Sequence, residues 1–313
     1  MTQKKAFTMI ELVMVIVVMG IVASIGADII SNLYQNYIKT RSIARLQSQT
    51  ELVLDQITKR LQYRIKESLI ARDGTKAATP APYYVTLPNA NDNYKIMEWI
   101  GKSNESFLGE HNGTRVVPGW SGFIDLDSDD TNRTTGTLKT NGSNLVFASN
   151  IINSLSYGSV DLNGTNGNQR PAIIFKGKDL FDISQYGWDG IDSNYTHNAT
   201  MNTNEILDIN GTNLPDTIYE QYDLAWSAYA LVPEGTSSDF NLTLHYNYQP
   251  WYNEKYDDNK TINPNIEKIV LIEHVSTFRF TQIGETIRLK LCINDDNRSG
   301  DYNFAFCKEK VVF

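Results

Sequence analysis

The sequence predicts an α+β protein in which a long N-terminal transmembrane-amphipathic helix packs on a C-terminal, antiparallel β-rich body. Three observations predict this class. Residues 10–30 are apolar except for Glu11 and Asp28, and an amphipathic pattern continues this run to residue 72. From residue 83 onward, short runs of β-branched and aromatic residues alternate with loops rich in Asn, Gly and Asp. Hydrophobic residues are 41% of the chain, which is enough for a packed core.

The apolar run is long enough to cross a membrane, because about 20 apolar residues span the hydrocarbon core as a helix. We therefore expect a transmembrane segment over residues 7–30. A cleavable secretory signal is the alternative, with "VASIGA" (Val22–Ala27) as its cleavage site. The helical pattern that continues past residue 30, and the acidic Glu11 inside the run, both count against that alternative.

Residues 31–72 are predicted to continue the helix with one apolar face. Its aliphatic residues recur at helical spacing: Leu46, Val53, Leu54, Ile57, Leu61, Ile65 and Leu69. "RDGTKAATPAP" (Arg72–Pro82) then supplies the Gly and Pro that end a helix. We expect a sheet of the body to cover this face. A coiled coil is the alternative, but the stripe is too short and irregular for sustained heptads.

The body, residues 73–313, is predicted to consist of short strands, with a polar and looped stretch over residues 187–220. The predicted strands are Tyr83–Leu87, Gly122–Leu126, Asn144–Ala148, Ala172–Phe175, Trp226–Leu231, Asn241–Tyr248, Lys268–Ile272, Thr277–Thr281, Thr286–Ile293 and Asn303–Phe313.

The charge is unevenly distributed along the chain. Residues 1–72 hold ten Lys and Arg against five Asp and Glu, so the chain's net charge of −8 leaves −13 on the body. An acidic body argues against nucleic acid as a partner. The basic helix could still contact anionic lipid or an acidic neighbour.

The N-terminal residues resemble a known family. A short basic leader, "MTQKKA", precedes "FTMIELVMVIVVMGIVASIG". Phe7, Thr8, Ile10, Glu11 and Gly20 fall on the class III signal and first helix of type IV pilins and of the pseudopilins of type II secretion systems. The C-terminal stretch "EHVSTFRFTQIGETIRLKLCIN" also resembles, by pattern, the sheet of J-type pseudopilins and large minor pilins.

The resemblance implies that residues 1–6 are a leader peptide. A prepilin peptidase would cut between Ala6 and Phe7 on the cytoplasmic side, and the new amine of Phe7 would be N-methylated. The family usually has Gly where this chain has Ala6, and major pilins commonly have a kinking Pro where it has Asp28. Because no Pro occurs before Pro80, the helix should run unbroken, which favours a minor or tip-proximal subunit.

Glu11 is the residue that the apolar run has to accommodate, because a charged side chain at the bilayer centre costs about 2.5 kcal/mol or more. Phe7 lies four residues earlier, about 6 Å along the helix axis. Glu11 can therefore pair with the processed amine of its own chain or of a neighbouring subunit. In the family this pairing sets the register of subunits in the filament. The alternative is a Glu11 side chain that reaches the lipid headgroups.

Cys292 and Cys307 are predicted to form a disulfide. They flank a segment with Ser299 and Gly300 at its midpoint. A hairpin folded there would place the two Cys opposite each other on antiparallel strands, within bonding reach. Two buried free thiols are the alternative, and the absence of a Cys/His cluster argues against a zinc site.

Eleven N-x-S/T sequons occur, and eight also have Asp or Glu two residues before the Asn. Acidic residues are 36 of 313, so chance would give about one such match among eleven sequons. The extended pattern resembles the acceptor of bacterial periplasmic N-glycosylation. It predicts glycans on surface loops of a periplasmic or surface-exposed body, unless an Asp- and Asn-rich composition alone produces it. The sites are Asn112, Asn132, Asn163, Asn194, Asn210, Asn241, Asn259 and Asn297.

Two further patterns contain residues that are suited to binding a ligand. Asp125, Asp127 and Asp129 alternate as calcium ligands can, but the Gly and Glu of a regular calcium loop are missing, so a solvated acidic turn is the alternative. The aromatic group Tyr246, Tyr248, Trp251 and Tyr252 could bind a sugar or a partner, or it could pack in the core. No catalytic motif is present in the sequence, and no cofactor is expected apart from this calcium.

The sequence therefore predicts a non-catalytic, minor type IV pilin-like subunit. We expect a single-pass inner-membrane protein with a periplasmic body, which moves into a filament or to the cell surface on assembly. Its expected partners are other pilin or pseudopilin subunits, the prepilin peptidase and inner-membrane lipid. A type II secretion pseudopilin is the nearest alternative, and a membrane-anchored adhesin or sugar-binding module is the alternative from another class.

Overall fold

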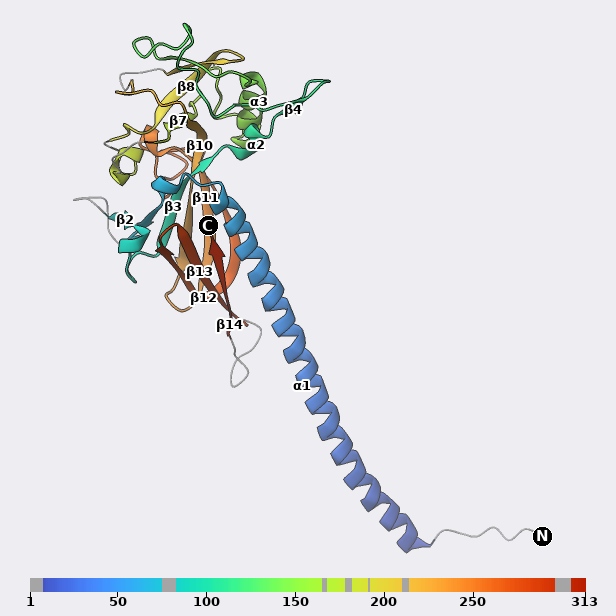
Figure 1. The fold of residues 1–313 in the computed structure, drawn as a ribbon. Helices are drawn as coiled ribbons and strands as arrows, with labels where there is room; N and C mark the ends of the chain where they lie inside the picture. Colours follow the sequence, from blue (N-terminus) through green and yellow to red (C-terminus); the bar gives the residue numbers. More distant parts are fainter. Residues whose placement is uncertain are drawn as a thin grey trace.

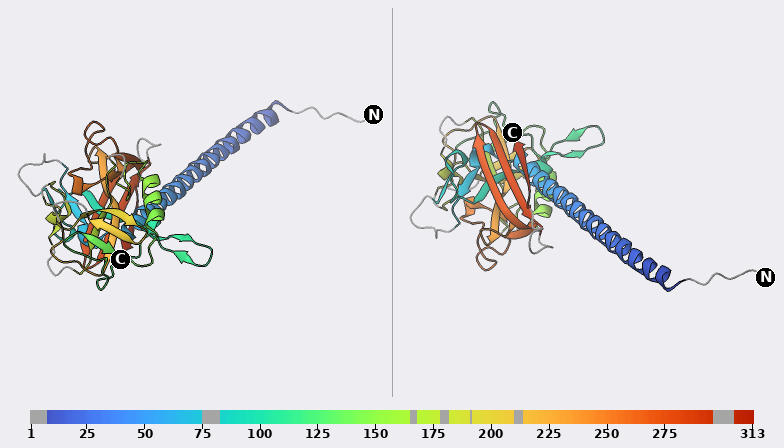
Figure 2. Two further views of the ribbon diagram at one scale, coloured as in Figure 1. Left: turned by 90° about the horizontal axis from the view of Figure 1, so that it is seen from above. Right: turned by 90° about the horizontal axis from the view of Figure 1, so that it is seen from below.

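The computed structural model describes residues 8–74, 83–164, 168–177, 182–190, 192–209, 214–295 and 305–313. One long helix projects from a β-rich body (Figures 1 and 2). The elements in chain order are α1 (Met9–Gln62), η1 (Lys66–Ser68), β1 (Ile70–Arg72), β2 (Tyr84–Thr86), η2 (Leu87–Asn89), β3 (Ile96–Lys102), α2 (Asn104–Phe107), β4 (Glu110–His111), β5 (Val116–Val117), β6 (Thr137–Lys139), α3 (Leu145–Leu155), β7 (Ala172–Phe175), η3 (Ile183–Tyr186), β8 (His197–Thr203), β9 (Ile206–Ile209), β10 (Tyr222–Gly235), β11 (Phe240–Tyr248), η4 (Pro250–Tyr252), β12 (Glu267–Ile283), β13 (Thr286–Asn294) and β14 (Ala305–Val312).

The body is built on a 12-stranded sheet in which the described strand pairs are antiparallel. Its main path runs β14-β13-β12-β11-β10-β7-β8-β9-β6, and β3 brings β1 and β2 to the sheet through β10. β10 is the central strand, because β11 pairs with one edge while β7 and β3 share the other. It is buried on both faces, which explains why its sequence is almost continuously apolar. The predicted fold class is confirmed.

The second half of α1 packs on the sheet. Leu54, Ile57 and Leu61 are buried in one cluster with Leu289 and Leu291 of β13. Each aliphatic side chain that is fully removed from water contributes about 1.5–3 kcal/mol. The sheet therefore covers the apolar face of the helix, as the periodicity predicts.

The helix is shorter than predicted, because α1 ends at Gln62 and not at residue 72. Backbone groups of β3 take over directly after it: the N–H of Ile65 donates to the C=O of Ile100, and the N–H of Lys102 donates to the C=O of Tyr63. Ile65 and Leu69 are buried as predicted, but they flank η1 and lie after the helix has ended.

A second group of elements forms the end of the body farthest from the start of α1, where Figure 1 shows α2, α3, β7 and β8. Residues 144–148 were predicted as a strand, and this prediction is wrong. Asn144 is the N-cap of α3, where its side-chain oxygen accepts the N–H of Phe147 at 3.2 Å. The helix buries Leu145, Ala148 and Ile152 at helical spacing.

Three other predictions about the body also need correction. Residues 122–126 form only an isolated bridge, between Phe123 and Gln221. The two strands predicted at 268–272 and 277–281 are one strand, β12. The stretch 187–220, predicted as loop, contains β8 and β9.

A buried ion pair links β1, β3 and β11. Glu98 of β3 is 1% exposed and accepts hydrogen bonds from Arg72 Nε and, at 3.2 Å, from the hydroxyl of Tyr248. The guanidinium of Arg72 also lies over the rings of Tyr84 and Tyr256, at 5.4 and 5.9 Å from their centroids. Burial acts to lower the pKa of Arg72, and the Glu98 carboxylate outweighs it, so this pKa lies above its ordinary value.

Candidate functional site

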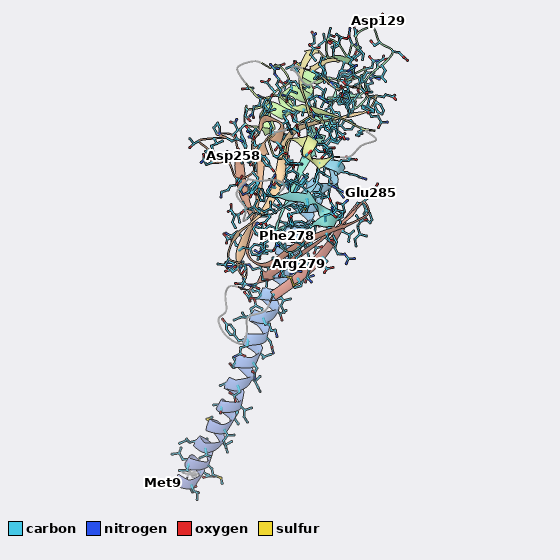
Figure 3. All side chains as sticks on the ribbon, turned by 90° about the vertical axis from the view of Figure 1, so that its left-hand side faces the viewer. Met9, Asp129, Asp258, Phe278, Arg279 and Glu285 are labelled. Atoms are coloured by element: carbon cyan, nitrogen blue, oxygen red, sulfur yellow. A yellow bond between two sulfur atoms is a disulfide. The ribbon has the colours of Figure 1, made fainter. Side chains whose placement is uncertain are left out.

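The first half of α1 is an uncovered apolar rod. Described residues 9–37 are exposed along its length, with only Gly26 partly covered, although the large side chains there are mostly aliphatic. Figure 3 shows Met9 at the far end of this rod from the body. Within the part of the chain that the structure describes, α1 is the one helix long and apolar enough to cross a membrane. Such a surface needs lipid or other apolar helices around it.

Thr8 and Glu11 form a reciprocal cap at the start of α1. The N–H of Glu11 donates to the Thr8 hydroxyl oxygen at 3.4 Å. In return, Oε2 of Glu11 accepts the N–H of Thr8 at 3.2 Å and its hydroxyl at 3.0 Å. This capping box satisfies backbone donors that would otherwise lack partners at the helix start.

The cap fixes where the Glu11 carboxylate lies: against the backbone nitrogen of Thr8, the residue directly after Phe7. Consecutive residues are about 3.8 Å apart along the backbone. A positive charge on Phe7 would be one residue along the chain from the backbone nitrogen whose N–H this carboxylate accepts. Ala6 and Phe7, the predicted processing residues, lie outside the described residues.

A family model for the prokaryotic N-terminal methylation motif matches residues 1–27. The chain carries a type IV pilin-like class III signal. The exposed apolar helix that follows fits this signal and fits membrane anchoring. The motif implies assembly with other pilin subunits in general. No curated protein and no solved structure matches the chain.

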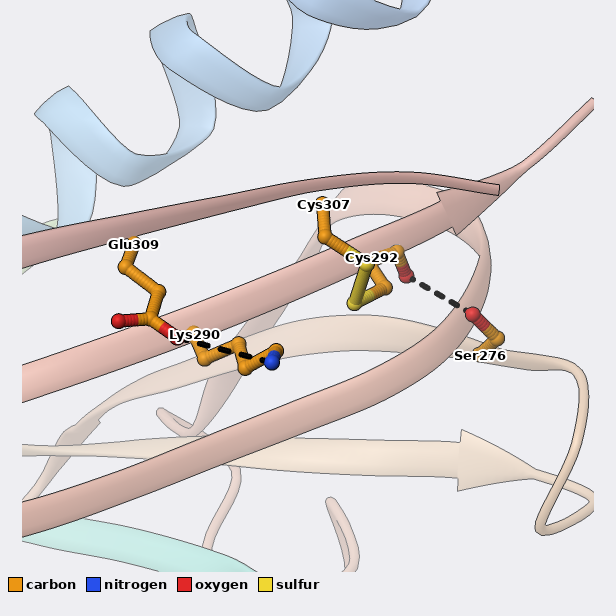
Figure 4. Close-up of a disulfide and its surroundings, with 5 residues drawn as sticks. All are labelled: Ser276, Lys290, Cys292, Cys307 and Glu309. Carbon is orange, nitrogen blue, oxygen red and sulfur yellow. Dashed lines mark hydrogen bonds and ion pairs between the residues drawn. A yellow bond between two sulfur atoms is a disulfide. The ribbon is translucent and has the colours of Figure 1, made fainter. Parts of the chain in front are cut away.

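The predicted disulfide is present. Cys292 and Cys307 are paired across β13 and β14 and are bonded (Figure 4). Lys308 of β14 pairs with Glu51 of α1 at 3.0 Å. Since side chains alternate along a strand, Cys307 points to the face away from α1. The bond therefore closes the last hairpin on the outer face of the sheet.

The predicted glycosylation sites differ in accessibility. Asn112, Asn132, Asn163, Asn194 and Asn259 are exposed outside regular strands. Asn241 is an exception to the loop prediction, because it lies half-buried in β11. Asn210 and Asn297 lie outside the described residues.

Three of the exposed sites share one local geometry. The side-chain oxygens of Asn112, Asn132 and Asn259 each accept the N–H of the sequon Thr two residues later, at 3.1, 2.8 and 2.9 Å. In contrast, the Nδ2 of Asn194 donates to the side-chain oxygen of Gln185 at 2.6 Å. Whether any of these sites carries a glycan stays a prediction.

The structure does not gather the three acidic residues proposed as calcium ligands. Oδ1 of Asp125 accepts the N–H of Asp127 at 3.2 Å, and its Oδ2 accepts from Asn141 at 2.7 Å. Asp129 lies at the tip of the body (Figure 3). Among the described residues, no group of three or more His, Cys, Asp and Glu side chains could hold a metal ion.

The aromatic group of residues 246–252 packs mainly in the body. Tyr248 and Trp251 are buried, and Tyr246 and Tyr252 are half-buried. The hydroxyl of Tyr252 accepts the N–H of Arg170 at 3.3 Å. These contacts favour the core interpretation over an exposed sugar platform.

Sequence reasoning missed a cleft of about 430 Å³ between α1 and β12. It is lined by α1 residues from Ser42 to Val53, by residues 270–274 of β12, and by the end of β13 with Asp295. The run Ile269–Ile272, four consecutive aliphatic residues, was the one signal that could have indicated it.

Proposed function

We propose that this protein is a minor type IV pilin-like structural subunit without catalytic activity. A prepilin peptidase cuts it between Ala6 and Phe7, and the Phe7 amine is then methylated. Before assembly it waits in the inner membrane as a single-pass protein with a periplasmic body. It then inserts into a type IV filament through the first half of α1. The neighbouring pilin-type helices replace lipid around the apolar rod.

The observation that carries this proposal is the position of the Glu11 carboxylate in the first turn of an exposed apolar helix. The carboxylate is held on the nitrogen of Thr8, so cleavage before Phe7 creates its counter-charge at the adjacent residue. In an apolar environment an opposite charge is what makes such a carboxylate tolerable. A neighbouring subunit that supplies its own amine to Glu11 sets the register between the two helices.

The proposal also places this subunit at or near the tip of the filament. The body is large, and five of the predicted glycan sites are exposed on it. Glycans on every subunit would crowd a repeating shaft, whereas a single subunit at the end has room around it. A pseudopilin of a type II secretion system fits the same signal and helix, and it remains the alternative function.

Mass spectrometry of the protein from its native membrane tests the processing step. We expect a mature chain that begins with N-methylated Phe7. Where glycans are present, we expect higher occupancy on the peptides of Asn112, Asn132 and Asn259 than on those of Asn194 and Asn241. A mature chain that begins at residue 27 or 28 would refute the proposal, because the apolar rod would have been discarded.

Filament incorporation of Glu11→Gln tests the docking step. The amide keeps the shape of the side chain and removes its charge, so we expect the variant to stay in the membrane and to be lost from purified filaments. Asp28→Asn is the matched control, since it removes the other acid of the apolar run. Equal incorporation of both variants would contradict the role of Glu11.

A further inference from the structure

The first seven residues of β12 have one unpaired edge. β11 pairs with β12 from Glu267 onward. β13 pairs with β12 only between Val275 and Ile283 and stops there at Ile293. No strand in the described part of the chain pairs with the other edge of residues 267–273. An unpaired edge offers free backbone N–H and C=O groups to another extended chain.

The middle of this edge is aliphatic and partly exposed. Bulges and charged side chains commonly weaken edge pairing, and this edge has both. Its pairing with β11 shifts register between Phe240 and Leu242 and again between Leu242 and Thr243, and Glu267, Lys268 and Glu273 are charged. Between these charged residues, residues 269–272 are Ile, Val, Leu and Ile. Ile269 is 53% exposed and Val270 is 45% exposed. Leu52 of α1, which lines the same cleft as Val270, is 57% exposed. An apolar surface beside free backbone groups is suited to contact with another protein.

The cleft beside the edge also contains an unsatisfied buried acceptor. Asp295 lines it and is only 5% exposed. Its Oδ2 has no hydrogen-bond partner among the residues that the structure describes. A buried carboxylate oxygen without a donor is costly, so a donor that enters the cleft would be stabilised at this point.

The position of Asp295 also selects a direction. It directly follows β13, which runs antiparallel to β12. A new strand that continues the line of β13 along residues 267–273 would begin at Asp295 if it is antiparallel to β12. Its amino end would then meet the carboxylate. A parallel strand would instead bring its carboxyl end there, and like charges would repel.

We propose that the unpaired edge of residues 267–273 binds an extended segment of a partner protein, which adds to the sheet as an antiparallel strand. Its amino end, or a lysine there, donates to Asp295. Apolar side chains on one face of the segment contact Val270 and Leu52. The segment is about seven residues long, because the edge spans about 23 Å. This binding site goes beyond filament insertion and does not depend on it.

The test uses the full chain in lipid nanodiscs, produced in cells without glycosylation enzymes because Asp295 also belongs to the sequon of Asn297. The probe is a fluorescent peptide of seven residues, in which a free amino-terminal lysine precedes alternating valine and threonine. We expect it to bind and to slow amide hydrogen exchange in residues 267–273. A peptide of the same sequence with methylated backbone nitrogens should not bind, because it cannot form the ladder.

A variant of Asp295 tests the direction. Asp295→Asn should weaken the free-amine peptide about tenfold, the effect of losing one charge-assisted hydrogen bond. Asp129→Asn removes an exposed acid that does not line this cleft, so it is the matched control and should leave affinity unchanged. A control peptide begins with an acetylated, uncharged threonine in place of the amino-terminal lysine. It should bind the native chain and Asp295→Asn equally.

Three results would overturn the proposal. The first is equal binding of the normal and N-methylated peptides, because contact would then be apolar only. The second is exchange protection that falls elsewhere in the body, or no binding by either peptide. The third is protection of residues 267–273 that grows with protein concentration without any peptide, because the edge would then bind a second copy of the chain.

Discussion

The buried ion pair between Arg72 and Glu98 gives the sharpest stability prediction. Glu98→Gln keeps the shape of the side chain but leaves the Arg72 guanidinium, which is itself largely buried, without its counter-charge. Breaking a buried pair from one side costs about 3–5 kcal/mol. For a body of this size that corresponds to a fall in melting temperature of roughly 6–20 °C.

Related variants separate the stability cost of Glu98→Gln into the contributions of the hydrogen bond and of the unpaired charge. Tyr248→Phe removes one hydrogen bond to the carboxylate and should cost about 1.5–3 kcal/mol. The double variant Arg72→Met with Glu98→Gln also removes the unpaired guanidinium, so it should recover part of the stability that Glu98→Gln alone loses. Glu273→Gln makes the same chemical change at an exposed site and should stay within about 0.5 kcal/mol of the native chain.

Thermal unfolding of the full chain in nanodiscs, followed by near-ultraviolet circular dichroism, measures these differences. The reasoning fails if Glu98→Gln melts within about 2 °C of the native chain. It also fails if adding Arg72→Met to Glu98→Gln makes the protein still less stable, because the unpaired guanidinium would then not be the source of the cost.

Three further predictions follow from the same structure. The disulfide closes a loop with a sequence separation of 15, so Cys292→Ser with Cys307→Ser should lower the free energy of unfolding by about 3 kcal/mol in urea titrations. A loss under about 1 kcal/mol, or a different value for the chemically reduced native chain, would contradict this. Leu54→Ala empties a fully buried site between α1 and the sheet and should cost about 2–5 kcal/mol. The exposed Leu52→Ala is its control, and equal costs would argue against the packing described. Burial raises the pKa of Tyr248 well above its ordinary value. Above about pH 10 the unfolded chain therefore loses this proton while the folded chain keeps it, and stability should fall as pH rises, by up to about 1.4 kcal/mol per pH unit. Urea midpoints measured from pH 9 to 11.5 check this, and a constant midpoint would refute it.

The N-terminal helix could be predicted because its signals are local. A long apolar run and the spacing of residues 46–61 each indicate one structure almost unaided. The end of α1 could not be placed because Ile65 and Leu69 keep helical spacing after the helix has ended. There, hydrogen bonds to β3 determine the backbone, and those depend on contacts distant in sequence.

The errors in the body have identifiable causes. The run after Asn144 reads as a strand because it is short, apolar and partly β-branched, whereas the capping oxygen of Asn144 and the later Ile152 indicate a helix. β3 was missed because the buried Glu98 interrupts its apolar pattern. The disulfide, in contrast, needed only the hairpin midpoint between the two Cys. The cleft beside β12 could not be foreseen, since it depends on where β13 stops.

The unbroken course of α1 couples the anchor to the body as a rigid shaft. Between Ile30 and Leu46, the first buried residue of the helix, the rise is about 24 Å. Every residue along this interval also turns the helix by about 100°. An inserted alanine here would shift the body by only about 1.5 Å along the helix axis but rotate it by about 100° around that axis. The length of this interval therefore determines which side of the body each neighbour meets.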